Sequence, residues 1–418
     1  MMGLREEALK FHKDYQGKIG ICTKAPLLNS HDLSLAYTPG VAEPCREIYL
    51  NKDLSFAYTC RGNMVAVVSD GTRVLGLGDI GPEAAMPVME GKAVLYKIFG
   101  DVDAVPVCLD TRDADEFIRT VRLLQPSFAG INLEDIASPK CYEIEDALKE
   151  SMDIPVFHDD QHGTAIAAAA GAIGALRYIG KDIGSARFAV NGAGAAGTAI
   201  AALLLNAGAG DVIMLNSKGA MYEGMDMERV NRVQAALLPG TNKERRRGTL
   251  AEVGKGLDVL IGVSRAGAFT SEIIAGMGPK PVVFSLANPD PEISYLEAKE
   301  AGAAVAGTGR SDAPNQINNV IVFPGIFRGA IDVRARSINE EMKLAAVHAI
   351  VNLVGTDELR EDYVIPDIFD PRVAPAVAAA VAKAAIDSGA ARIQVDPEKV
   401  WQSATERIMN NKKTVGFA

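Results

Sequence analysis

One glycine-rich stretch limits the possible folds of this chain more than any other feature. The residues RFAVNGAGAAGTAIAALLL place a GxGxxG pattern between a short β-branched run and an apolar helical run. In that setting the first glycine makes a tight turn, the second lets the backbone approach a pyrophosphate, and the third lets helix and strand pack closely. The pattern predicts a dinucleotide site at Gly192, Ala193, Gly194, Ala195, Ala196 and Gly197. The alternative is an ordinary turn in a chain that contains 40 glycines.

The segments around this motif alternate between strand-like and helical patterns, which is typical of an open parallel sheet with helices on both faces. Strands are predicted at residues 187–191, 211–216, 258–263, 281–286 and 303–306, and earlier at 64–69, 104–109, 130–133 and 155–158. We therefore predict an α/β protein with a Rossmann-type, doubly wound parallel sheet domain at residues 161–310. An α/β N-terminal substrate and metal domain, residues 1–160, would precede it. A C-terminal helical segment, residues 311–418, would pack back on the catalytic domain.

Composition narrows the function classes. The chain has 418 residues, of which 48% are apolar, and a formal net charge of −10 at pH 7. An acidic surface argues against binding to nucleic acid or to an anionic membrane. The longest apolar stretch, residues 165–176, is shorter than the ~20 residues that span a bilayer, and no signal-peptide pattern opens the chain. Because the five cysteines are dispersed without CxxC spacing, we expect a cytoplasmic protein with reduced thiols.

The residues at the end of the predicted strand 211–216 bear on the choice between NAD and NADP. An NAD-specific site usually has an acid there to hold the ribose 2′-hydroxyl. This chain has Asn216, followed by Ser217 and Lys218. Without the acid nothing repels a 2′-phosphate, and Ser217 and Lys218 can donate hydrogen bonds to it, which favours NADP. The alternative is that Asn216 binds the NAD ribose and Lys218 is solvated.

Two pairs of acids follow neighbouring predicted strands upstream of the glycine motif. Glu134 and Asp135 end the segment AGINLED, and Asp159 and Asp160 end PVFHDD. Adjacent carboxylates repel each other, and an unpaired buried carboxylate is costly. A hard divalent cation with oxygen ligands, Mg²⁺ or Mn²⁺, explains both pairs. The alternative is helix capping, with Asp135 directed toward Ser138 and Asp160 at the start of the next helix.

A lysine, a tyrosine and two histidines lie in segments that suit a site. Lys92 is surrounded by apolar residues, and desolvation would lower its pKa toward the range of a general base. The alternative is an amine that reaches water on an apolar stem. Tyr37 is followed by Thr-Pro-Gly and is expected at a turn, where a local hydrogen bond is the alternative to a catalytic role. His158 and His162 flank the second acid pair and are expected to be structural or to support the metal ligands.

Eight ordered segments resemble the compact prokaryotic malic enzymes over nearly the whole chain. They are LAYTPGVAEPC, VVSDGTRVLGLGDIG, AMPVMEGKAVLYK, INLEDI, FHDDQHGTAIA, VNGAGAAG, SLANPDPEI and TGRSDAPNQINNVIVFPGIFRGA. The resemblance implies oxidative decarboxylation of L-malate to pyruvate and CO₂ with reduction of NAD(P)⁺, dependent on Mg²⁺ or Mn²⁺, in a homodimer or homotetramer. Two other interpretations stay open: an oxidative decarboxylase of another 2-hydroxy diacid, such as tartrate, and a non-catalytic dinucleotide sensor.

The resemblance also implies roles for individual residues. Lys92 would be the general base toward the C2 hydroxyl, and Tyr37 the general acid that protonates the enolate carbon after CO₂ leaves. Asp159 would orient Lys92 or a water on the metal. The metal ligands would be Glu134, Asp135 and Asp160. The substrate would be bound by Arg73, Asn288, Asn318 and Asn319, and Asn288 would also contact the cofactor. Arg61 is the alternative to Arg73 as the partner of a substrate carboxylate.

Overall fold

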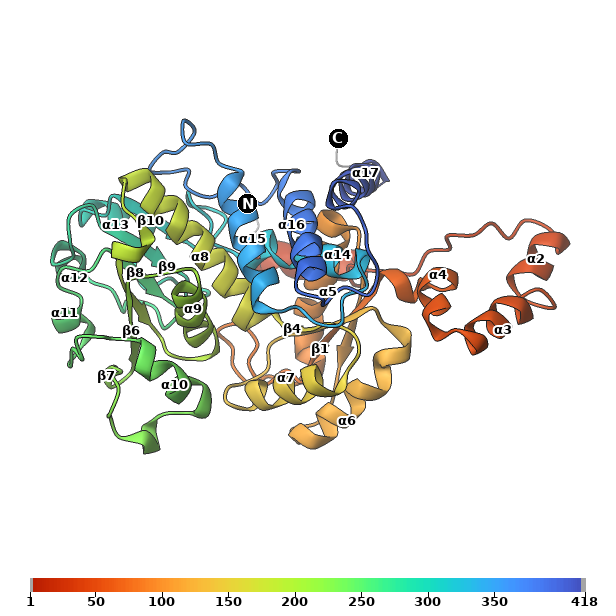
Figure 1. Cartoon of the computed structure of the whole chain (residues 1–418), viewed down its shortest axis with the longest axis horizontal. Helices are drawn as coiled ribbons and strands as arrows, with labels where there is room; N and C mark the ends of the chain where they lie inside the picture. Colours follow the sequence, from red (N-terminus) through yellow and green to blue (C-terminus); the bar gives the residue numbers. More distant parts are fainter. Residues whose placement is uncertain (1–2, 415–418) are drawn as a thin grey trace.

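A computed structural model describes residues 3–414 and contains one β-sheet in each half of the chain (Figure 1). The first sheet has four strands in the order β2-β1-β3-β4, and all its neighbouring strands are parallel. These strands are β1 (Met64–Ser69), β2 (Asp103–Cys108), β3 (Gly130–Leu133) and β4 (Val156–His158). Each lies within one residue of its predicted bounds, because runs of β-branched and apolar residues are typical of strands.

The second sheet has six strands in the order β10-β9-β8-β5-β6-β7. They are β5 (Arg187–Asn191), β6 (Asp211–Asn216), β7 (Gly219–Ala220), β8 (Val259–Gly262), β9 (Val282–Ser285) and β10 (Val305–Thr308). All pairs are parallel except β6 with β7, a two-residue strand that was not predicted. The predicted Rossmann-type sheet domain is confirmed, with β5 in the interior of the sheet.

Helices cover both faces of this second sheet. Successive side chains of a strand point to opposite faces, and in β5 the apolar side chains on each face are buried under helices. Phe188 and Val190 of β5 belong to the core formed with α8 (Asp159–Ile179) and α9 (Ala195–Asn206). Ala189, between them, belongs to the core on the other face. That face is covered by α11 (Leu250–Val253), α12 (Ser271–Ala275) and α13 (Tyr295–Glu300). The sheet is therefore doubly wound, as predicted.

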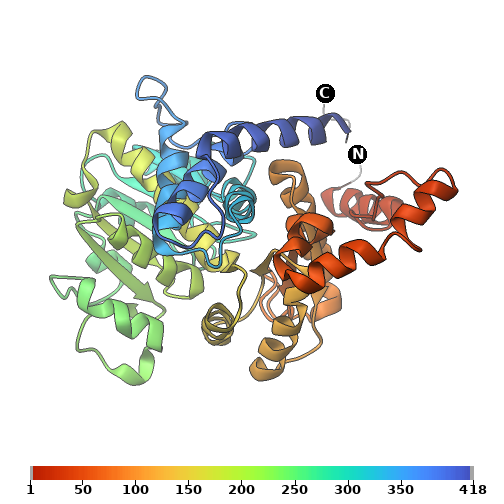
Figure 2. The same ribbon diagram turned by 45° about the vertical axis from the view of Figure 1, so that its right-hand side comes forward.

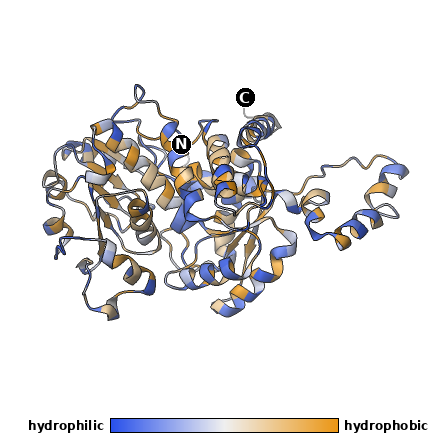
Figure 3. Cartoon of the chain, in the orientation of Figure 1, coloured by the Kyte–Doolittle hydropathy of each residue, from blue (hydrophilic) through white to orange (hydrophobic). Residues whose placement is uncertain are grey.

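Helix α8 connects the two halves of the molecule. It begins directly after β4 and continues into the core of the second half, where it packs against α9 and β9 (Figure 1). Its small residues permit that approach: a Cβ on Gly174 would lie 2.0 Å from the carbonyl oxygen of Val364, and one on Gly171 would lie 2.4 Å from Ile317 Cδ1. Figure 3 shows the apolar colour along much of this helix. The acids at its first turn are thereby held at the junction of the two halves.

The C-terminal helices return to the first sheet. They are α14 (Phe323–Asp332), α15 (Glu340–Asn352), α16 (Val373–Asp387) and α17 (Pro397–Thr414). Both α14 and α17 pack on α5 (Pro82–Gly100), and the ring of Tyr96 on α5 lies 4.6 Å from that of Phe323 and 5.4 Å from that of Phe327. The remaining body helices are α4 (Ser55–Tyr58), α6 (Ala114–Leu124), α7 (Lys140–Ser151) and α10 (Arg232–Leu237).

Near the N-terminus, residues 25–51 form what we name the arm. It contains α2 (Ser30–Ala36) and α3 (Ala42–Leu50), neither of which has a buried side chain. Figure 1 shows both helices projecting away from the body, and Figure 2 shows the same region turned by 45°. Helix α1 (Leu4–Tyr15) precedes the arm and has no buried side chain either. None of the helices in residues 3–414 is both long and apolar enough to cross a membrane.

Candidate active site

The two acid pairs meet because β3 and β4 are neighbours in the first sheet. Leu133 pairs with His158, so the residues that follow each strand leave the same edge side by side. The backbone N–H of Asp135 donates to Oδ2 of Asp160 over 2.7 Å. Glu134, Asp135 and Asp159 are buried, while Asp160 is partly exposed. We name these four residues, Glu134, Asp135, Asp159 and Asp160, the acid cluster.

Lys92 of α5 lies within this cluster. Its Nζ is 2.5 Å from Oδ2 of Asp159 and 2.8 Å from Oε1 of Glu134, and it lies 4.2 Å from the ring centroid of Phe323. The side chain is 7% exposed, so the alternative of a solvated amine is wrong. Burial lowers the pKa of Lys92, but the charges of Asp159 and Glu134 outweigh it and raise that pKa above its ordinary value. The predicted lowering is therefore wrong for this state, because the apolar neighbours of Lys92 in sequence gave no sign of two carboxylates from other strands.

The acid cluster brings four carboxyl groups to one lysine, so ionising all four in the absence of another cation is unfavourable. Burial, reinforced by the charges of Asp160 and Glu134, raises the pKa of Asp135 to about 9. Burial also raises the pKa of Asp159 to about 7 and that of Asp160 to about 6. Oδ2 of Asp135 and Oδ1 of Asp159 are buried without a hydrogen-bond partner. Carboxylate oxygens without a positively charged partner are the kind of ligand that a hard divalent cation prefers.

The ligand set Glu134, Asp135 and Asp160 stays a prediction. Among residues 3–414 no three Asp, Glu, His or Cys side chains converge into a group that could hold a metal ion. Glu134 is engaged by Lys92, and one oxygen of Asp160 accepts from the Asp135 amide. The capping alternative is not supported at either helix. Asp160 lies in the first turn of α8, but the N-cap residue of α8 is His158 and no side chain caps it, and α7 is preceded by Pro139 without a side-chain cap.

The predicted substrate residues divide into those near the acid cluster and those that lie apart. Asn319 Nδ2 donates to Oδ2 of Asp159 over 2.5 Å, so the second half of the chain reaches the cluster directly. The backbone N–H of Arg73 donates to the carbonyl of Asp135 over 2.9 Å, and the Arg73 side chain is exposed. Asn318 instead caps the 3₁₀ turn η7 (Asn319–Ile321) and donates to the carbonyl of Gly309.

Two further predicted substrate-binding residues are Asn288 and Arg61, the alternative to Arg73. The loop after β1, which carries Arg73, packs on the turn after β9: a Cβ on Gly76 would lie 2.9 Å from the carbonyl oxygen of Asn288. Arg61 is engaged elsewhere, with Nη1 donating to Ser55 Oγ over 2.7 Å and its guanidinium 4.0 Å from the Phe56 ring centroid. The structure therefore favours Arg73 over Arg61 as the arginine beside the acid cluster.

The glycine motif has the geometry that a pyrophosphate needs. Gly192 has φ +112°, and a Cβ there would lie 2.5 Å from the carbonyl oxygen of Val263. A Cβ on Gly197 would lie 1.9 Å from the carbonyl oxygen of Gly192, so both positions require glycine for packing. Around Gly194 no atom lies within 4 Å of such a Cβ, which leaves open space at the N-terminus of α9. This geometry favours a dinucleotide loop over an ordinary turn.

Several supporting side chains were not predicted. Gln234 of α10 donates to the carbonyl of Ala193 and so braces the glycine loop; its only sequence signal is the capping pattern that Asn231 begins. Glu145 of α7 is buried and contacts both His158 and His162, the histidines expected to be structural. Glu145 is one of several acids in α7, and nothing in the sequence separates it from the solvated ones.

Tyr37 is the predicted catalytic residue that the structure does not bring to Lys92. It lies at the C-terminal end of α2 in the arm and is 68% exposed. Its backbone N–H donates to the carbonyl of Leu33. In Figure 1 the arm projects from the body, whereas α5, which carries Lys92, lies inside it. Within one chain, the lysine and the tyrosine are apart.

The chain combines a dinucleotide loop on a doubly wound sheet with a buried lysine among carboxylates, and α8 joins the two parts. These features define it as a dinucleotide-dependent oxidoreductase of two α/β units. Its family follows from comparison with known proteins. Residues 16–149 match the family "Malic enzyme, N-terminal domain", and residues 161–386 match "Malic enzyme, NAD binding domain". The chain belongs to the malic enzyme family, and the resemblance seen in the sequence is confirmed.

Individual relatives agree with this assignment. The bifunctional malic/malolactic enzyme of Bacillus subtilis is 58% identical over 96% of this chain and 97% of its own length. The NAD-dependent malic enzyme of Geobacillus stearothermophilus is 51% identical over 90% of this chain and 78% of its own. The crystal structure of the malic enzyme of Pyrococcus horikoshii superposes with a TM-score of 0.93 at 46% identity, covering 100% of both chains. Further relatives, 45% and 47% identical, are named NADP-dependent malic enzymes.

Proposed function

We propose that this chain converts L-malate to pyruvate and CO₂ with reduction of NAD(P)⁺, and that a divalent ion, Mg²⁺ or Mn²⁺, binds at the acid cluster. The observation that carries the proposal is the burial of Lys92 between Asp159 and Glu134, beside Asn319. An amine, two carboxylates and an amide that lie together where α8 begins support a proton-transfer step at this site. We place the reaction in the cytoplasm, where dispersed thiols stay reduced.

Each bound group would supply one part of the chemistry. NAD(P)⁺, when bound, would accept the hydride from C2, and a divalent ion held by Glu134, Asp135 and Asp160 would act as a Lewis acid toward the C2 oxygen. Lys92 takes the proton of the C2 hydroxyl, and Asp159 keeps its amine oriented. To act as a base Lys92 must first be neutral. A divalent ion bound by Glu134 would lower the pKa of Lys92, because it would neutralise one of the two carboxylates that now contact the amine. Arg73, Asn288, Asn318 and Asn319 bind the substrate, Arg73 through a charge-assisted pair with a carboxylate.

The direct test mixes the purified protein with L-malate and Mn²⁺ and follows the absorbance of reduced nicotinamide, with EDTA in a matched sample. We expect turnover that yields pyruvate and that EDTA abolishes. Tartrate is assayed in parallel. If malate is not turned over while Mn²⁺ and the dinucleotide still bind, malate is the wrong substrate, and another 2-hydroxy diacid takes its place.

Parallel assays with NAD⁺ and NADP⁺ test cofactor choice. Asn216 Oδ1 accepts from the backbone N–H of Lys218 over 2.9 Å, so this side chain supports its own turn, while Ser217 and Lys218 are exposed at the end of β6. No acid at this turn repels a 2′-phosphate. We therefore expect a higher kcat/KM for NADP⁺. A higher kcat/KM for NAD⁺ would mean that Asn216 binds the ribose of NAD and that Lys218 is solvated.

A second product is suggested by the Bacillus subtilis relative, whose name includes malolactic activity. If the reduced dinucleotide and pyruvate stay bound, hydride return to the pyruvate carbonyl and uptake of a proton give lactate, so that malate becomes lactate and CO₂ with no net oxidation. The same assay mixture is analysed for lactate as well as pyruvate. Pyruvate alone means that pyruvate is released, and lactate means that the hydride returns to it.

We further infer that two copies of the chain assemble so that Tyr37 of each completes the site of the other. The arm exposes large apolar side chains to solvent: Leu28 and Tyr49 are each 86% exposed, Leu50 78% and Leu35 61%. Monomeric proteins rarely expose a patch of this kind, and a self-complementary dimer buries the same patch of both copies. A second copy would cover the apolar arm and supply Tyr37 as the acid that protonates the enolate carbon.

A further inference from the structure

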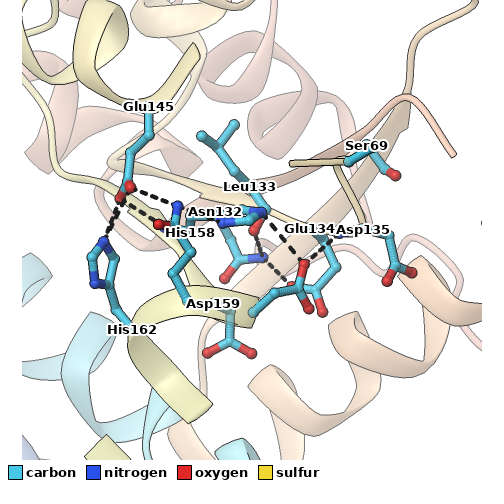
Figure 4. A network of polar contacts seen from close by, with 12 residues as sticks. Ser69, Asn132, Leu133, Glu134, Asp135, Glu145, His158, Asp159 and His162 are labelled. Carbon is cyan, nitrogen blue, oxygen red and sulfur yellow. Dashed lines mark hydrogen bonds and ion pairs between the residues drawn. The ribbon is translucent and has the colours of Figure 1, made fainter. Parts of the chain in front are cut away.

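A buried carboxylate with no role in the reaction lies behind the acid cluster. Glu145 of α7 is 3% exposed. Its Oε1 forms an ion pair with Lys149 Nζ at 2.6 Å and accepts from the backbone N–H of His158 over 3.2 Å. Its Oε2 accepts from Nε2 of Gln161 over 3.0 Å. His162 Nε2 lies 2.9 Å and 3.0 Å from the two oxygens. Figure 4 shows Glu145 reaching toward both histidines, with Asp159 and Glu134 beyond them.

The carboxylate determines which way the Gln161 amide faces. A carboxylate only accepts hydrogen bonds, so the NH₂ group of Gln161, and not its oxygen, must face Glu145. The same nitrogen lies 2.8 Å from Nδ1 of His158. Its second hydrogen therefore points to that ring atom, and Nδ1 must be an acceptor. A neutral imidazole that accepts at Nδ1 carries its proton on Nε2.

The proton on Nε2 of His158 faces the acid cluster. This nitrogen is buried, has no hydrogen-bond partner of standard geometry and lies 3.4 Å from Oδ2 of Asp160. An N–H in that place attracts the carboxylate. The other tautomer would present a lone pair to it and repel it. The order of contacts thus runs from Glu145 through Gln161 and His158 to Asp160.

We propose that Glu145 is a positioning residue: through the Gln161 amide it selects the His158 tautomer whose Nε2–H orients Asp160 for the divalent ion. The proposal deepens the proposed function, because it rests on Asp160 as a metal ligand. Groups behind metal ligands typically contribute about 10–100-fold to metal affinity, since they hold the ligand in one orientation. Glu145 needs no contact with the substrate to act in this way.

The variant E145Q tests the order of contacts. Lys149 can only donate, so the oxygen of the new amide must face Lys149 and its NH₂ must face Gln161. The Gln161 amide then has to turn over, and the His158 proton moves to Nδ1. We expect the Kd for Mn²⁺, measured without substrate from the EPR signal of free Mn²⁺, to rise about tenfold. The ¹⁵N shifts of labelled histidine should show the tautomer change, and the KM for the dinucleotide should not change.

Two further variants keep the test decisive. Q161M keeps the charge of Glu145 but removes the amide, and it should weaken Mn²⁺ binding in the same way. E150Q changes an exposed acid of α7 for which the described chain provides no ion pair, and it should match wild type. A folded E145Q with wild-type Mn²⁺ affinity and an Nε2-protonated His158 overturns the proposal. So does an equal loss of Mn²⁺ and dinucleotide binding with a lower melting temperature, because that result marks a structural role only. Failure of wild type to turn over malate overturns the proposed function but leaves the Mn²⁺ titration and the tautomer measurement valid.

Discussion

The charge of Lys92 is set by residues far from it in the sequence. Asp159, 67 positions away, accepts from its amine, and Glu134 provides the second carboxylate. Asp159 is in turn held by Asn319, 160 positions further along. A buried carboxylate with two donors on one oxygen has little freedom to move, so neighbouring side chains must leave room for it.

Gly163, one turn after Asp159 on α8, provides that room. A Cβ there would lie 1.9 Å from Oδ1 of Asp159 and 3.1 Å from Cβ of Asn319. We expect G163A to displace the carboxylate that orients Lys92 and to lower kcat by about 10²-fold, the usual effect of a misplaced catalytic group. Alanine favours a helix, so the melting temperature should change little. G240A is the control, because its Cβ would meet only Leu205 Cδ1, at 3.8 Å. An unchanged kcat in G163A would show that Asp159 can move without consequence.

Strand β2 ties three elements of the N-terminal half together through its first residue. Asp103 accepts from Lys24, in the segment that leads to the arm, over 2.6 Å and from Lys97 of α5 over 2.8 Å. Asn63, just before β1, donates to it over 3.0 Å. Burial raises the pKa of Asp103, but these hydrogen bonds outweigh it and lower that pKa to about 2. The carboxylate therefore links the arm segment, α5 and the first sheet as one unit.

In wild type the contribution of this link to stability should depend on pH, and the variant D103N tests this. A lowered carboxyl pKa stabilises the fold at every pH above the ordinary value of 3.8, and the contribution is lost as pH falls toward about 2. Because Lys24 is exposed, we expect the free energy of unfolding at pH 7 to fall by only about 1 kcal/mol. Urea unfolding at pH 7 and pH 3 measures the difference between variant and wild type, which should be smaller at pH 3. An equal difference at both values would show that the effect is not electrostatic.

The shape of the whole molecule separates Tyr37 from Lys92, and this leads to a test of subunit cooperation. Y37F and K92A should each lose about 10²–10⁴-fold in kcat, as expected for a missing acid or base. If Tyr37 acts in the partner's site, a mixed dimer of the two variants has one site with both native residues. Random exchange of subunits should then restore about a quarter of wild-type activity, because half of the dimers are mixed. Activity is measured after co-expression with two different tags. A mixture that stays inactive would place Tyr37 in the site of its own chain.

The features that the sequence determined by itself depend on residues that are close together along the chain. Strand bounds follow from apolar and β-branched runs, and the dinucleotide loop follows from glycines at Gly192 and Gly197 that no other residue could replace. The two acid pairs were predicted to end neighbouring strands, and β3 and β4 do pair. The exceptions lacked a distinctive signal: β7 has two residues, Gln234 lies in a helix of six residues, and Glu145 is one of several acids in α7.

Only the tertiary structure decided the state of the site. The pKa of Lys92, the tautomer of His158 and the place of Tyr37 all depend on groups that the chain brings together, or keeps apart, over long separations. Electrostatic and hydrogen-bond effects act through space at a few ångströms, whereas a sequence pattern reports only neighbours along the chain. For that reason the sequence could name the chemical groups of this enzyme, while their charges and partners had to come from the fold.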